Sequence, residues 1–325
     1  MSKAVCSSWR EILRQNFTDW VRLADFLELT AEQRRDLIVS RHFPLNLPKR
    51  LADKIVKGTL DDPIFKQFVP TSAEMVEQVG FGCDPVGDLE SRKLSKLLHK
   101  YQGRALLLCT SACVVHCRYC FRQHFAYDVQ DKLFQDELDA IRSDSTINEV
   151  ILSGGDPLSL SDAVLSALIT DIAAIPHVTR LRFHTRFPIG IPERLDDSFL
   201  SLFDELDLAV WFVIHSNHPK ELDEDVLAGL KRLQRKGVVV LNQAVLLSGV
   251  NDDVEVLAEL CEKMVDNGIF PYYLHQLDRA KGTAHFEVDE EKGRGLIKAL
   301  MGRLPGYAIP KYVREIAGES SKTPL

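Results

Sequence analysis

The sequence has no apolar run long enough to cross a membrane and no signal-peptide-like stretch at its N-terminus. A spanning helix needs about 18 or more apolar residues in a row, whereas the longest runs, residues 208–214 and 238–247, are of strand length or interrupted by polar residues. Positive charge is not in excess either, because the formal net charge is −7. We therefore expect a cytoplasmic protein that binds neither a membrane nor nucleic acid.

A disulfide framework is also missing. The chain has seven cysteines, an odd number, and only three of them are clustered. This argues against a secreted disulfide-rich protein and agrees with a cytoplasmic location. No repeat of fixed period is present. With 325 residues, 45% of them hydrophobic, the chain is long enough to bury a large core in one domain or two.

The pattern of the chain changes twice. Residues 1–100 show helical spacing over Trp9–Phe17, Trp20–Leu29 and Ala31–Val39 and then several prolines, which predicts a helical N-terminal region with a packing role. Residues 101–303 alternate between short apolar runs and amphipathic segments, which predicts the core domain. Residues 304–325 are rich in Gly and Pro and form a C-terminal segment with one expected short strand, Lys311–Ile316.

The core region predicts six strand–helix units. The predicted strands are Arg104–Cys109, Glu149–Leu152, Arg180–His184, Leu208–Ile214, Val238–Leu246 and Phe270–Leu274. The predicted helices are Lys132–Arg142, Ser161–Ala174, Ser198–Glu205, Glu221–Arg235, Val254–Asn267 and Glu290–Met301. Such alternation indicates an α/β fold with a parallel sheet. The pattern alone leaves two architectures open, a β/α barrel and a doubly wound sheet.

Three cysteines, Cys113, Cys117 and Cys120, follow the first predicted strand within eight residues. Thiolates favour iron–sulfur clusters, zinc or copper(I). A zinc site with a nearby histidine is one alternative, but structural zinc usually binds two separated cysteine pairs. Three thiolates would leave one iron of a [4Fe–4S] cluster able to bind another ligand. The spacing C-x3-C-x2-C, with Tyr119 before the last cysteine, resembles the signature of radical S-adenosylmethionine (SAM) enzymes.

Polar residues gather where the later strands end. Gly154, Gly155 and Asp156 follow the second strand and resemble the Gly-Gly-Glu/Asp element that contacts the SAM amino group in radical SAM enzymes. Arg186 and His215 follow the third and fourth strands, and Gln243 lies in the fifth. In β/α barrels the active site lies at the C-terminal ends of the strands. We therefore expect these residues at the active site, in the region that binds SAM. The further polar segments with this placement are residues 216–219 and 275–278.

Over most of its length the sequence resembles the lysine 2,3-aminomutase family, and within it the short bacterial branch that serves elongation factor P. The markers are Cys113–Phe125, Ser153–Pro157, His215–Pro219, Gly249–Asp252 and Pro271–Asp278. The resemblance implies a radical SAM partial (β/α)6 TIM-like barrel preceded by the helical N-terminal region. It also implies an isomerase that moves the amino group of L-lysine from C2 to C3.

The resemblance implies pyridoxal 5′-phosphate (PLP) as a cofactor beside the [4Fe–4S] cluster and SAM. Lys322, before Thr-Pro, matches the lysine that forms the Schiff base with PLP, although Glu-Ser-Ser replaces most of the glycines that the family has there. Arg104, Lys100 and Tyr101 match the segment that contacts the PLP phosphate. Longer family members bind zinc through C-terminal cysteines; here no cysteine follows Cys261, so we expect no zinc.

The resemblance also implies a substrate site. Arg122 matches the residue that pairs with the substrate α-carboxylate, a role that suits a guanidinium. Asp278 and Glu315 match the two acidic residues that hold the ε-ammonium, with Glu in place of the usual Asp at 315. Two carboxylates favour a cation, because a buried ammonium without anionic partners is costly. The expected substrate is therefore lysine.

The expected partners are lysine, a reductant protein such as flavodoxin and, functionally, elongation factor P with its lysine ligase, which would receive (R)-β-lysine. Homo-oligomerisation is left open. Three alternatives also stay open at this point: a glutamate 2,3-aminomutase, a radical SAM enzyme without PLP, and a non-enzymatic zinc or iron–sulfur protein.

Overall fold

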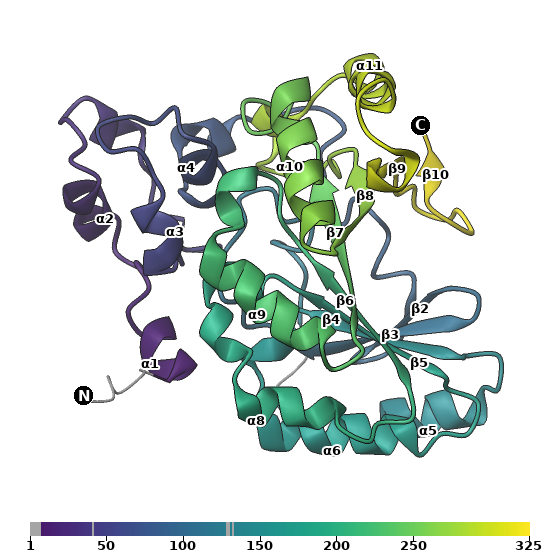
Figure 1. Cartoon of the computed structure of the whole chain (residues 1–325). Coiled ribbons are helices and arrows are strands. Elements are labelled where there is room, and N and C mark those ends of the chain that lie inside the picture. Colours follow the sequence, from purple (N-terminus) through teal and green to yellow (C-terminus); the bar gives the residue numbers. More distant parts are fainter. Residues whose placement is uncertain (1–7, 41, 128–130, 132) are drawn as a thin grey trace.

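The computed structural model describes residues 8–40, 42–127, 131 and 133–325. In this part of the chain the strands form one ten-stranded sheet in which each strand pairs with the next along the sequence (Figure 1). The strands are β1 (Arg92–Leu94), β2 (Leu97–Tyr101), β3 (Arg104–Thr110), β4 (Glu149–Gly154), β5 (Arg180–Thr185), β6 (Ala209–Ile214), β7 (Val239–Val245), β8 (Phe270–His275), β9 (Lys311–Arg314) and β10 (Thr323–Pro324).

The helices divide into an N-terminal group and a group that alternates with the strands. The N-terminal helices are α1 (Trp9–Leu13), α2 (Trp20–Phe26), α3 (Lys49–Asp53) and α4 (Pro63–Phe68). The others are α5 (Gln135–Ser143), α6 (Asp162–Ala173), α7 (Phe187–Gly190), α8 (Asp197–Leu200), α9 (Glu224–Gln234), α10 (Val254–Asp266) and α11 (Glu290–Met301). Asp or Ser side chains cap the starts of α6, α9, α10 and α11, which explains where these helices begin.

The strand order decides between the two architectures. Strands β3 to β9 are all parallel and run in sequence order, whereas β1, β2 and β10 are antiparallel additions at the two ends. A doubly wound sheet reverses its strand order at a switch point, so that alternative is wrong. The two outermost strands do not pair with each other in the described residues, and the sheet is therefore a partial barrel.

The alternation of side chains along the strands separates the core from the interior of the barrel. In β5, Leu181 and Phe183 are buried in the hydrophobic core, while Arg182 and His184 line the interior cavity. Successive side chains of a strand point to opposite faces, and the helices cover the outer face (Figure 1). A residue's position in its strand therefore decides whether it can reach the cavity.

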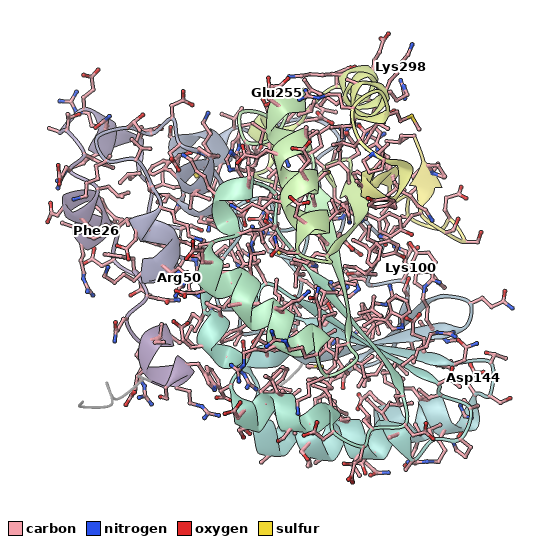
Figure 2. All side chains as sticks on the ribbon, viewed as in Figure 1. Phe26, Arg50, Lys100, Asp144, Glu255 and Lys298 are labelled. Carbon is pink, nitrogen blue, oxygen red and sulfur yellow. The ribbon has the colours of Figure 1, made fainter. Side chains whose placement is uncertain are left out.

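The N-terminal helices are joined to the barrel by packing and charge. Arg50 of α3 forms ion pairs with Glu193 (3.1 Å) and Asp223 (2.9 Å), beside the start of α9 (Figure 2). Phe65 and Phe68 of α4 are fully buried in the main core. This attachment places α4 directly against the site described below.

Two features of the N-terminal region differ from the prediction. The helix predicted over Ala31–Val39 is only a 3-10 turn, Gln33–Asp36, and residues 92–101 form the β1–β2 hairpin instead of helix. The hairpin forms because β2 pairs antiparallel with β3, a tertiary contact that the helical spacing upstream does not reveal. Ser198–Glu205 is likewise split into α8 and a 3-10 turn, and Lys132, the predicted start of a helix, lies outside the described residues.

None of the helices that the structure describes is both long enough and apolar enough to span a lipid bilayer.

Candidate active site

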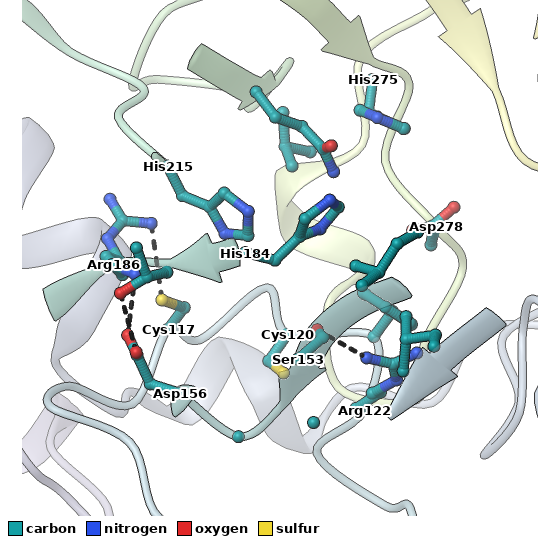
Figure 3. A pocket seen from close by; sticks show the side chains of 18 of the residues that line it. Cys117, Cys120, Arg122, Ser153, Asp156, His184, Arg186, His215, His275 and Asp278 are labelled. Atoms are coloured by element: carbon teal, nitrogen blue, oxygen red, sulfur yellow. Dashed lines mark hydrogen bonds between the residues drawn. The ribbon is translucent and has the colours of Figure 1, made fainter. Parts of the chain in front are cut away.

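One cavity of about 350 Å³ lies inside the partial barrel, and the predicted site residues all line it. Figure 3 shows part of this lining, including Cys117, Cys120 and Arg122. They are Lys100, Tyr101, Arg104, Cys113, Cys117, Cys120, Arg122, Gly154, Gly155, Asp156, Arg186, His215, Gln243, Asp278, Glu315 and Lys322. They come from β2 and β3, from the segments at the carboxyl ends of the parallel strands, and from the C-terminal segment. Tertiary structure thus brings together residues up to 222 positions apart (322 − 100).

The loop that carries the three cysteines is held against the end of β4. The backbone N–H of Gly155 donates to Thr110 (2.6 Å) and that of Asp156 donates to Ala112 (2.7 Å). A Cβ atom on Gly155 would lie 2.4 Å from the Ala112 carbonyl oxygen, and Gly154 has a φ of +104°. These glycines therefore permit close approach of two backbone segments. The contact with SAM that the sequence predicts for this element stays a prediction.

The Asp156 carboxylate joins its own loop to the end of β5. Its carboxylate accepts hydrogen bonds from the Thr185 hydroxyl (2.7 Å), the Arg186 N–H (2.8 Å) and the Leu158 N–H (3.1 Å). Burial raises the pKa of Asp156 to about 6, and these hydrogen bonds limit the rise. Both oxygens are occupied within the protein, so in this structure Asp156 orders the loops around the cavity.

Arg186 connects the cysteine loop to helix α4. Its guanidinium donates to Glu221, to Gln67 (3.2 Å) and to the Tyr119 hydroxyl, and it lies 3.5 Å from the Cys117 sulfur (Figure 3). Arg186 and Glu221 are both buried, and such a pair is tolerated when it is well hydrogen-bonded. Gln67 and Glu221 were not predicted, because nothing local in the sequence marks them as partners of this arginine.

Two of the residues expected to bind the substrate, Arg122 and Glu315, form ion pairs with other residues of the cavity in this structure. Arg122 donates to Asp88 (2.7 Å) and weakly to Ser153 (3.4 Å; Figure 3). Glu315 lies between two ammonium groups, those of Lys100 (2.7 Å) and Lys322. Lys100, expected at the PLP phosphate, is therefore engaged with a carboxylate here.

The two acidic residues expected to bind the substrate ε-ammonium, Asp278 and Glu315, differ in their pKa values. Burial, and then the nearby Glu315 charge, raise the pKa of Asp278 to about 7. Burial alone would also raise the pKa of Glu315, but Lys322 and Lys100 lower it to about 2. Close to neutral pH, Glu315 carries a full negative charge and Asp278 only part of one.

Three histidines, one in β5, one directly after β6 and one at the end of β8, line the cavity with unpartnered ring nitrogens. The Nε2 atoms of His184, His215 and His275 are buried and have no hydrogen-bond partner among the described residues. Burial lowers the pKa of His215 to about 3 and lowers those of His184 and His275, so all three rings are neutral. His184 was missed as a site residue; its interior position in β5 was the available signal.

The residues present fit the cofactors that the sequence implies. Three thiols share the cavity, although in the described residues no group of three or more His, Cys, Asp or Glu is close enough together to hold a single metal ion. Lys322 provides an amine inside the cavity. Arg104 has no ion-pair partner within the described part of the chain and stacks over Tyr101, 4.7 Å from the ring centre. A free guanidinium and unpartnered imidazoles suit a phosphate and a polar ring.

Comparison with known proteins agrees with this geometry. Residues 107–261 match the model of the radical SAM superfamily. The chain is 41% identical over 320 residues to the L-lysine 2,3-aminomutase of Haemophilus influenzae, covering 97% of this chain and 95% of the relative. It is 40% identical to that of Escherichia coli (98% and 94% covered) and 32% identical to that of Clostridium subterminale (100% and 79%).

The fold also matches a solved radical SAM structure. Streptococcus suis SuiB bound to S-adenosylmethionine superposes with a TM-score of 0.50 at 13% identity, covering 66% of this chain and 51% of that one. At this identity the similarity concerns the fold alone, and it confirms the predicted architecture. The family resemblance is confirmed by near full-length relatives. The chain therefore belongs to the lysine 2,3-aminomutase family of radical SAM enzymes, whose superfamily implies a [4Fe–4S] cluster and SAM.

Proposed function

We propose that this protein converts L-lysine to β-lysine by moving the amino group from C2 to C3. The observation that carries the proposal is the position of Lys322. Its ammonium group lies in the same cavity as Cys113, Cys117 and Cys120 and next to the acidic residues of the substrate site. The relatives named as L-lysine 2,3-aminomutases, which match over nearly the whole chain, support the same reaction.

The cysteines and Lys322 would hold the reactive groups. When bound, the cluster and SAM supply hydrogen-atom abstraction, and PLP supplies electron delocalisation that lets nitrogen migrate between neighbouring carbons. Lys322 offers the amine for covalent attachment of PLP, and the unpaired guanidinium of Arg104 offers a partner for its phosphate. The remaining residues orient the substrate and exclude water from a reactive radical.

Arg122 and the two acidic residues would fix the substrate at its two ends. Arg122 pairs with the α-carboxylate, and Asp278 and Glu315 accept hydrogen bonds from the ε-ammonium. The side chain of glutamate would place a carboxylate against these two acidic groups, and repulsion between buried like charges would weaken its binding. The proposal therefore favours lysine over glutamate as the substrate.

We further propose that the product is (R)-β-lysine, that it is attached to elongation factor P by a separate ligase, and that a flavodoxin-like protein reduces the cluster. This part rests on the resemblance to the short bacterial branch. Its test is to determine the configuration of the product and to ask whether it is incorporated into elongation factor P in the presence of the ligase.

The central experiment separates the competing functions. The enzyme is reconstituted anaerobically with iron, sulfide and PLP, supplied with SAM and a reductant, and offered lysine and glutamate in separate reactions. We expect β-lysine and no β-glutamate by mass spectrometry, and PLP at Lys322 after borohydride reduction. Absence of β-lysine would overturn the proposal. Formation of β-glutamate, or SAM cleavage without PLP at Lys322, would identify one of the alternative enzymes; failure to bind SAM would indicate a non-enzymatic protein.

A further inference from the structure

A short loop between the N-terminal helices and the β1–β2 hairpin reaches into the cavity. The Asp84 carboxylate accepts hydrogen bonds from the backbone N–H groups of Asp88 (2.9 Å) and Leu89 (3.0 Å). Gly87 has a φ of +68°, and a Cβ atom there would lie 3.0 Å from that of Ala317. The loop over residues 84–89 is therefore both closed on itself and packed tightly against the segment that leads to Lys322.

This loop places the buried carboxylate of Asp88 beside Arg122. Asp88 is 4% exposed and Arg122 is 9% exposed. The Oδ2 atom of Asp88 accepts a hydrogen bond from the Nε atom of Arg122 at 2.7 Å. The guanidinium also lies over the ring of Phe121, 4.8 Å from its centre. Asp88 and the ring together restrict the orientation of the guanidinium plane.

The contact with Asp88 leaves the outer edge of the guanidinium available. Nη1 has one long contact, with the Ser153 hydroxyl at 3.4 Å, and Nη2 has no acceptor among the described residues. A carboxylate binds such an edge through two parallel hydrogen bonds. The geometry points to Asp88 as a positioning residue that holds the Nε edge of Arg122 and turns its Nη1–Nη2 edge toward the α-carboxylate of the amino-acid substrate. This inference rests on the proposed function, in which Arg122 binds that carboxylate.

Positioning of this kind has a physical advantage. An arginine side chain has several rotatable bonds, and fixing it only when the substrate binds would reduce affinity. A buried guanidinium without an anionic partner is also destabilising. In the free enzyme, Asp88 already restricts the Arg122 side chain and supplies its anionic partner. Neither penalty therefore reduces the affinity for the substrate. Among the described residues, the hydrogen bond from Nε to Oδ2 is the one that joins the two side chains, so the pairing leaves the Nη1–Nη2 edge for the substrate.

The test compares two ligands that differ only in the α-carboxylate, L-lysine and 1,5-diaminopentane. Their dissociation constants are measured on the reconstituted, PLP-loaded enzyme, and the ratio Kd(diaminopentane)/Kd(lysine) reports recognition of the carboxylate. We expect Asp88→Ala to lower this ratio by at least about tenfold, the loss of roughly one charge-assisted hydrogen bond. Asp88→Asn keeps an acceptor for Nε, so we expect a smaller decrease.

A control variant removes a partly buried ion pair elsewhere. Asp162 pairs with the fully buried Arg194 at 2.7 Å, and neither lines the cavity. Asp162→Ala should lower the melting temperature without changing the ratio. A ratio that stays at the wild-type value in both Asp88→Ala and Asp88→Asn would overturn the inference, as would a wild-type ratio near one. If Asp88→Ala does not fold, the ratio measured for Asp88→Asn alone tests the inference. Because the readout is binding, an absence of β-lysine contradicts the proposed function without affecting this comparison.

Discussion

The Nζ atom of Lys322 forms an ion pair with the Oε2 atom of Glu315. The register of the terminal hairpin explains this contact. Strand β10 pairs antiparallel with β9, with Thr323 opposite Arg314 and Pro324 opposite Val313. The residue before Thr323 therefore lies across from Glu315. Although Lys322 is only three residues from Leu325, it is held in the cavity by strand pairing and by charge.

Lys322→Ala removes the amine proposed to bind PLP. We expect no PLP attached to the protein after borohydride reduction and at least about a hundredfold loss of β-lysine formation, because the cofactor would no longer be fixed relative to the substrate. Lys311→Ala is the matched control, since Lys311 is exposed at the start of β9 and outside the cavity. Peptide mass spectrometry checks the attachment. Retention of covalent PLP in the Lys322 variant would contradict the assignment.

Asp278 makes lysine binding depend on pH. Its pKa is raised to about 7, so its carboxylate ionises as the pH rises from 6 to 8. We expect KM for lysine to fall over this range in the wild type, because the ε-ammonium gains an anionic partner. Asp278→Asn should raise KM by about tenfold at pH 8 and flatten the profile. A wild-type profile that persists in Asp278→Asn would exclude Asp278 as its origin.

The raised pKa of Asp278 also predicts that the stability of the protein changes with pH. The folded protein holds the Asp278 proton more tightly than the unfolded chain, whose carboxyl has the ordinary pKa of 3.8. The contribution of Asp278 to the free energy of unfolding therefore decreases as the pH rises from about 4 through about 7. Asp278→Asn, which carries no charge at any pH, should be more stable than the wild type at pH 8 and nearly equal to it at pH 4. Thermal melts of the two proteins at both values provide the measurement.

Substitution of the three loop cysteines should have effects that substitution of other cysteines does not have. Replacing Cys113, Cys117 or Cys120 by Ala should abolish the brown iron–sulfur absorbance after reconstitution and all SAM cleavage, since each thiolate holds one iron. Cys83→Ala and Cys261→Ala should leave both unchanged, because Cys83 is exposed and Cys261 is buried in α10, away from the cavity. A normal cluster content in any of the first three variants would remove that residue from the ligand set.

Gly155→Ala tests the contact between β4 and the cysteine loop. The added Cβ would lie 2.4 Å from the Ala112 carbonyl oxygen, and the backbone would have to move. We expect a destabilisation of about 1–3 kcal/mol together with incomplete cluster loading. Gly295→Ala in α11 meets no atom within 4 Å and should be neutral or stabilising, because Ala favours helix. Equal melting temperatures and iron contents in the two variants would show that the contact is unimportant.

The local pattern of the sequence was sufficient to predict the parallel strands of the core. Each predicted parallel strand is present within about two residues of its predicted bounds, because apolar runs flanked by polar turns define buried strands. The residues expected in the site also share one cavity. For the residues that follow parallel strands, this outcome is expected, since parallel strands bring their carboxyl ends to one side of a sheet. Lys100, Arg104 and Lys322 reach the same cavity from β2, from the start of β3 and from the segment before β10.

The sequence by itself determined the cysteine spacing, the alternation of strands and helices and the identity of the charged residues near the site. Only the tertiary structure decided how these charges are paired. Asp88 with Arg122, Glu315 with Lys100, and Glu221 with Arg186 are partners far apart in the chain. Periodicity depends on neighbours within a few positions, whereas an ion pair depends on which distant segments converge when the sheet curves into a partial barrel. The three cysteines could be found from their spacing; the roles of Asp88 and Glu221 as partners of Arg122 and Arg186 could not.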